Sequence, residues 1–86
     1  MSVESLNHYI QQCGAEVVDA WGSEVSHHVE VTYRNEPASI EFALGLCVVH
    51  ADCIERGLCY QGSPIAPQEL GTELERLYES MNSENG

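Results

Sequence analysis

The first residues of the chain carry apolar side chains at the spacing of one helix face. They recur at steps of three and four residues, the period of an amphipathic α-helix, at Val3, Leu6, Ile10, Cys13 and Val17. Gly14 weakens a helix at this point, so we predict an N-terminal helix that ends near it. Residues 15–22 fit either a continuation of that helix or a short strand, and their pattern leaves both open.

Residues 24–33 alternate between two kinds of side chain. Val25, His27, Val29, Val31 and Tyr33 occupy the odd positions and polar residues the even ones, which is typical of a half-buried strand. A lone strand leaves its backbone donors and acceptors unpaired, and residues 38–44 also alternate after a turn at 34–37. We therefore predict an antiparallel β-hairpin over about 24–44.

The next apolar positions also fit a helix face. They are Ile40, Leu44, Cys47, Ala51, Ile54 and Leu58. We place Gly45 as the boundary between the hairpin and a helix over about 46–56, which Gly57 ends. Pro67 suits the first position of a last helix over about 67–81, and residues 82–86 form a polar, flexible tail.

These elements predict a small single α+β domain of 86 residues. An N-terminal helix precedes a small antiparallel sheet, and two C-terminal helices cover one face of that sheet. The sequence has no basic, apolar leader and no apolar run long enough to span a membrane. We therefore expect a cytoplasmic location, in which cysteines are normally reduced.

The charge balance of the chain indicates which kinds of partner it can bind. Fourteen acidic residues stand against three arginines, with no lysine, and the formal net charge is −11. A field of this sign opposes direct binding to nucleic acid or to an anionic membrane, because both require basic side chains. It favours a partner with a basic surface. The candidate partner-binding residues are four carboxylates of the last helix and two of the sheet: Glu69, Glu73, Glu75, Glu79, Glu30 and Glu41.

In charge and size the chain is similar to the small acidic inhibitors of phages and mobile elements, some of which imitate nucleic acid. The resemblance is one of composition, with no motif behind it. It implies an anti-defence inhibitor that docks electrostatically on a basic, nucleic-acid-handling enzyme or complex. The alternative is a small structural or regulatory module that forms a homodimer and whose acidity is incidental.

The stretch from Leu46 to Cys59 contains the residues that favour metal chemistry. Cys47, His50, Cys53 and Cys59 are ligand types that zinc prefers, and they form the least favoured alternative, a zinc-binding domain. On a helix the first three would fan over about 120°, which is wide for ligands of one ion. We therefore interpret Cys47 as an apolar filler of the core and expect no cofactor. His27 and His28 lie in mid-strand, so their rings should point to opposite faces.

Catalytic motifs are absent from the sequence. No nucleophile motif, glycine-rich phosphate loop or H-E-x-x-H pattern occurs, and a chain of this length has little room for a catalytic pocket. We therefore expect a binding protein and not an enzyme.

Overall fold

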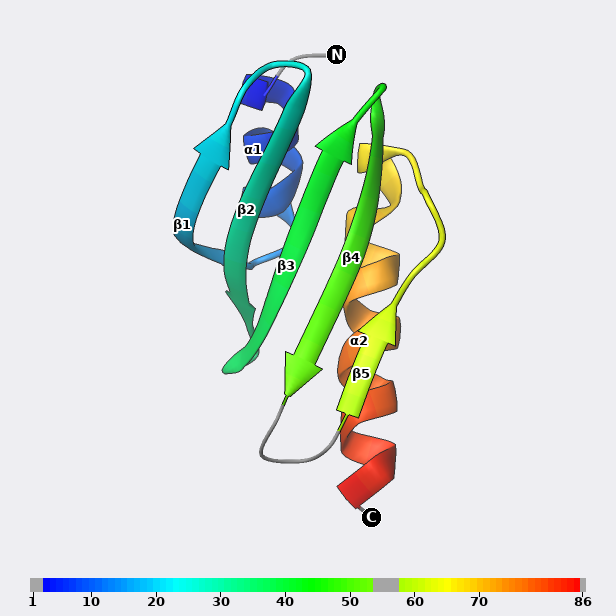
Figure 1. The fold of residues 1–86 in the computed structure, drawn as a ribbon. Helices are drawn as coiled ribbons and strands as arrows, with labels where there is room; N and C mark the ends of the chain where they lie inside the picture. Colours follow the sequence, from blue (N-terminus) through cyan, green and yellow to red (C-terminus); the bar gives the residue numbers. More distant parts are fainter. Residues whose placement is uncertain (1–2, 54–57, 86) are drawn as a thin grey trace.

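The computed structural model describes residues 3–53 and 58–85. Five antiparallel strands form one sheet in the order of the sequence, and two helices pack on it (Figure 1). This confirms the α+β class, the N-terminal helix and the hairpin. The elements in chain order are α1 (Val3–Gln12), β1 (Glu16–Gly22), β2 (Ser26–Tyr33), β3 (Glu36–Ala43), β4 (Leu46–Cys53), β5 (Leu58–Gln61), the 3₁₀ turn η2 (Pro67–Glu69) and α2 (Leu70–Asn85).

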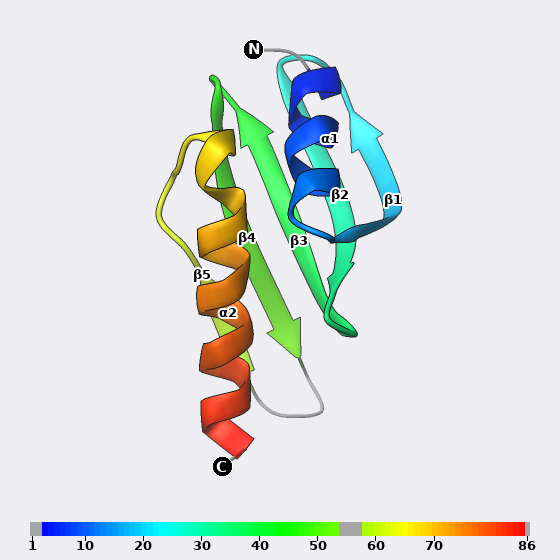
Figure 2. The same cartoon turned by 180° about the vertical axis from the view of Figure 1, so that it is seen from behind.

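Both helices cover the same face of the sheet, and Figure 2 shows them from that side. The core centres on the cross-strand row of Val29, Ile40 and Val49, each 0% exposed. The strands also bury Val31, Phe42 and Cys47, and the helices contribute Leu6, Ile10, Leu70, Leu74 and Leu77. Burying an aliphatic side chain of this size contributes about 1.5–3 kcal/mol relative to exposure, so this contact decides which face of β2, β3 and β4 is covered.

The predicted helix over 46–56 is wrong, because residues 46–53 form strand β4. Cys47, Val49 and Ala51 are buried against the helices, while Val48 and His50 are only partly buried. The apolar spacing suggested a helix, but it does not account for the hydrogen bonds of β3. One edge of β3 pairs with β2, and the backbone groups of its other edge also require partners. Strand β4 provides them, pairing antiparallel from Ala43 with Leu46 to Ser39 with His50. Residues 54–56 of the predicted helix lie outside the described residues.

The segment that the pattern left undecided, residues 15–22, contains strand β1. It is an edge strand with a bulge at Val18, between the pairs Val17–Val31 and Asp19–Glu30. On the opposite side of the sheet, the N-terminal end of β4 pairs with a residue that belongs to no strand. Cys47 and Ile65 exchange backbone hydrogen bonds of 2.7 and 2.8 Å. Pro67, predicted to be the first residue of the last helix, begins the 3₁₀ turn η2 instead, and α2 begins at Leu70. Helix α2 extends to Asn85 through most of the segment expected to be a tail.

The β3–β4 connection is a two-residue turn in which Leu44 and Gly45 both have positive φ, 56° and 76°. This is the backbone of the type I′ hairpin turn, which Asn-Gly suits best. Gly45, predicted to be a helix boundary, therefore serves the turn. Leu44 adopts this conformation at a cost of about 1–2 kcal/mol, because the Cβ atom of an L-residue in the left-handed region lies too close to a backbone carbonyl oxygen. Its side chain is 94% exposed.

Replacing Leu44 by asparagine should therefore stabilise the protein. We expect Leu44→Asn to raise the free energy of unfolding by about 1 kcal/mol, measured by urea denaturation. Val25→Asn is the matched control, because Val25 is 74% exposed in the neighbouring turn and its φ is not positive. An equal gain in both variants would contradict the turn geometry.

The buried thiol of Cys47 makes the core sensitive to alkaline pH. Burial raises the pKa of the Cys47 thiol from 9.0 to about 12, so the folded state holds this proton more tightly than the unfolded chain. Its contribution to stability is complete below pH 9 and is lost as the pH rises toward 12.

The difference in unfolding free energy between the wild type and Cys47→Ala should therefore shrink as the pH rises from 9 to 12. Denaturant titrations at successive pH values measure it, and the subtraction removes the tyrosines common to both proteins. A difference that stays constant across this range would show that the thiol is not buried.

Candidate functional site

One face of the sheet carries no helix, and Figure 1 looks onto it. Because side chains alternate along a strand, the residues between the core positions lie on this side. We call this surface the open face; its residues include Asp19, Trp21, His28, Glu30, Ser39, Glu41, Val48 and His50, together with Val18, Thr32, Pro37 and Leu46. It presents aromatic, acidic and imidazole groups side by side.

One cross-strand row runs over all five strands of the open face. Strand pairing aligns Asp19, Glu30, Ser39, His50 and Gln61 in that order. Asp19 and Glu30 are direct neighbours of like charge, which is unfavourable in a sheet. Asp19 accepts a hydrogen bond of 2.9 Å from the backbone N–H of Ala20, but neither carboxylate pairs with a cation in the described part of the chain.

A second row lies two residues further along the strands. The ring of Trp21 stacks on that of His28, with centroids 5.5 Å apart and planes 4° from parallel. On the next strand, one carboxylate oxygen of Glu41 lies 3.9 Å from Nδ1 of His28 and 3.6 Å from Nε2 of His50. Nε2 of His50 makes no hydrogen bond with the described residues. Trp21 remains 48% exposed, so it is available for contact.

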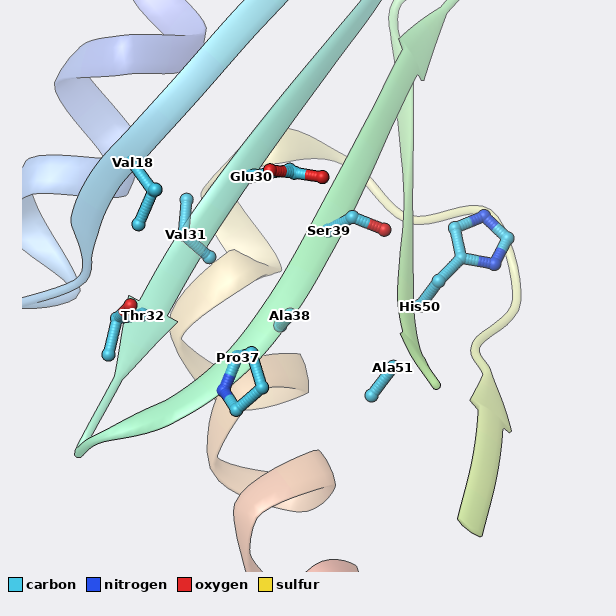
Figure 3. Close-up of a pocket in the computed structure, with 9 residues that line it drawn as sticks. All are labelled: Val18, Glu30, Val31, Thr32, Pro37, Ala38, Ser39, His50 and Ala51. Carbon is cyan, nitrogen blue, oxygen red and sulfur yellow. The ribbon is translucent and has the colours of Figure 1, made fainter. Parts of the chain in front are cut away.

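A hollow of about 410 Å³ lies beside these rows. Its lining includes Val18 from the bulge of β1, Glu30 and Thr32 from β2, Pro37 and Ser39 from β3, and His50 from β4. Figure 3 shows Glu30 and Ser39 extending in the same direction, toward the strand that bears His50. The hollow therefore combines apolar side chains such as Val18 and Pro37 with one carboxylate, that of Glu30.

The acidic residues predicted on the last helix differ in their surroundings. Glu73 is only 3% exposed, and one of its carboxylate oxygens lies 3.3 Å from Nη1 of Arg76. Burial, followed by the charge of Glu73 and a hydrogen bond with it, raises the pKa of Tyr60. The carboxylate also fills the space beside Gly62. Glu73 is therefore a structural residue, and we leave it out of the contact surface.

Glu75 also interacts with other side chains of the protein. The hydroxyl of Tyr33 donates a hydrogen bond of 2.6 Å to Glu75, and Arg34 lies 3.4 Å from the same oxygen. The hydrogen bond to Glu75 is the main reason that the pKa of Tyr33 is raised.

The six predicted contact residues do not converge on one surface. Glu69 and Glu79 are exposed on the helical side of the molecule, whereas Glu30 and Glu41 lie on the open face beyond the sheet. A second hollow, of about 550 Å³, includes Glu75 and Glu79 but also Arg76.

The structure places two of the four candidate zinc ligands apart. Cys47 is buried on the helix-covered face and His50 lies on the open face, while the side chains of Cys53 and Cys59 lie outside the described residues. Among the residues described, no group of three or more His, Cys, Asp or Glu side chains is arranged to hold a metal ion. As predicted, His27 and His28 lie on opposite faces.

The sequence prediction missed Trp21, Asp19 and His28 as members of one surface. The alternation in 24–33 already placed His28 and Glu30 opposite the buried valines. Trp21 and Asp19 could be added only once residues 16–22 were known to be a strand, because the bulge at Val18 breaks their own alternation.

Comparison with known protein families, curated proteins and solved structures gave no match. Within residues 3–53 and 58–85, no helix is long and apolar enough to cross a membrane.

Because Glu73 is a structural residue, removing its carboxylate should destabilise the fold. We expect Glu73→Ala to lower the free energy of unfolding by about 2–3 kcal/mol, because it leaves Tyr60 without its partner and opens a gap beside Gly62. The control Glu69→Ala, at an exposed position, should change it by less than about 0.5 kcal/mol. Urea denaturation measures both, and equal effects would show that Glu73 is not structural.

Proposed function

We propose that this protein is a non-enzymatic inhibitor that docks by its acidic surface on a basic, nucleic-acid-binding protein. It occupies the surface on which that protein takes phosphate. The formal net charge of −11 on 86 residues supports this class of partner, since opposite fields accelerate association and position the two surfaces.

The observation that carries the proposal is how the protein uses its arginines. Arg34 pairs with Glu75 and Arg76 with Glu73, the two carboxylates of α2 that are least exposed. Seven exposed acidic residues make no ion pair with Arg34 or Arg76: Glu4, Glu16, Asp19, Glu30, Glu41, Glu69 and Glu79. The two arginines of the described residues therefore pair within the fold and leave these seven carboxylates without an arginine partner.

A surface of this kind resembles nucleic acid to a basic partner. Lysine and arginine side chains that bind phosphate also bind carboxylates, and a folded acidic domain presents carboxylates at fixed separations. The inhibitor needs no catalytic group, because occupying the phosphate-binding surface is sufficient to exclude the nucleic acid.

The test is affinity capture from a cell lysate, followed by competition. We expect the immobilised protein to retain a basic nucleic-acid-binding protein, and added DNA or RNA to displace it. The association rate should fall roughly tenfold or more from low to high salt. A variant with Glu30, Glu41, Glu69 and Glu79 all changed to glutamine is the control, and its association should be slower.

Two results would reject the proposal. One is capture that does not depend on ionic strength or on the four carboxylates. The other is a captured protein that still binds its nucleic acid when the inhibitor is present in excess.

A further inference from the structure

We propose that the open face is the docking surface, and that it receives an arginine side chain of the basic partner on Trp21 between the carboxylates of Asp19 and Glu30. This inference rests on the proposed function and specifies it. It assigns the contact to the sheet rather than to α2, and it names the chemical group of the partner that is recognised.

The protein already contains one arginine site built from the same groups. The guanidinium of Arg34 lies 5.6 Å from the ring centroid of Tyr33 and 5.1 Å from that of Tyr78. It also lies 3.4 Å from a carboxylate oxygen of Glu75. Aromatic rings and a carboxylate together bind a guanidinium well, because it is planar, weakly hydrated and always charged.

The open face presents the same groups without a cation among its described residues. Trp21 is held in place by stacking on His28 and is still 48% exposed. Asp19 lies on the same strand two residues away, a distance of about 7 Å, and Glu30 is paired with Asp19 on the next strand.

The pair of like charges favours the binding of a cation. Asp19 and Glu30 repel each other across the strands, which costs stability in the free protein. A guanidinium between them turns this repulsion into two attractive contacts. The hollow beside Glu30, about 410 Å³ in volume, gives room for a further part of the same partner segment.

Charge complementarity decides between the occupants of the open face. A second copy of this chain also carries −11, and no arginine or lysine of its described residues lies on the open face. Nucleic acid is repelled by the same field. A segment of a basic protein is the occupant whose charge fits both carboxylates and the indole ring.

The experiment uses the fluorescence of Trp21, which is the only tryptophan in the chain. An oligoarginine peptide and an oligolysine peptide of equal length are titrated into the full-length protein at low salt. We expect a saturable change in emission with both peptides. The arginine peptide should bind roughly three- to tenfold more tightly, because arginine stacks on the indole and binds carboxylates through two N–H groups.

The variants separate the open face from general acidity. We expect Glu30→Gln to weaken arginine-peptide binding about fivefold to tenfold, and Glu79→Gln, with the same change in net charge on α2, less than about twofold. Glu30→Gln also relieves the repulsion with Asp19, so thermal melting should show it to be at least as stable as the wild type. Its loss of binding is then not a loss of folding.

Trp21 itself is tested by calorimetry, which does not need the fluorophore. Trp21→Ala should weaken the arginine peptide about fivefold or more, and Trp21→Phe, which keeps an aromatic ring, should restore most of the affinity.

The outcomes distinguish this inference from the proposed function. If Glu79→Gln weakens binding as much as Glu30→Gln, or if both peptides bind equally, the arginine site on the open face is rejected while an acidic inhibitor remains. If neither peptide binds at low salt, both proposals fail. If light scattering shows a dimer that Trp21→Ala dissociates, the open face is covered by a second copy and the inference is overturned.

Discussion

One-sided burial of the sheet is the constraint on which the rest of this structure depends. Val29, Ile40 and Val49 form a row that is fully buried under the two helices. A strand that slipped by one residue would move its apolar side chains to the wrong face, so this row fixes the register of β2, β3 and β4. It thereby also fixes which residues face away from the core, including Glu30, Glu41 and His50.

The same constraint explains how the charge is distributed. The helices cover one face, and the second face carries polar residues together with Trp21, Val48 and the exposed apolar side chains of Val18, Pro37 and Leu46. The arginines of the described chain lie at α2 and in the β2–β3 turn, where they pair with Glu73 and Glu75. With both described arginines paired in this way, the carboxylates of the open face have no arginine partner among the described residues. The unfavourable neighbours Asp19 and Glu30 are the clearest case, because they cost stability and no described residue compensates them.

The parts of the fold that were predictable from the sequence depend on local periodicity. The alternation of Val29, Val31 and Tyr33 and the stripe of Leu70, Leu74 and Leu77 correspond to buried positions in a strand and a helix. The error at 46–53 has a different origin. Cys47 and Ala51 are four residues apart and fit a helix, whereas the pairing of β4 with β3 depends on contacts that no local pattern contains. Gly45 was informative in both interpretations, but the pairing of Ala43 with Leu46 across it shows that it belongs to a hairpin turn.

For the candidate site, the sequence indicated the kind of surface but not its place. Glu30 and Glu41 were chosen for their charge and lie on the open face, whereas Glu73, chosen by the same criterion, is buried. The most direct measurement of the central claim is a nuclear magnetic resonance map of the protein with its captured basic partner. The open-face proposal predicts the largest shifts at the Trp21 indole N–H and the side chains of Val18 and Val48. Shifts confined to the exposed side of α2, around Thr72 and Glu79, would contradict it.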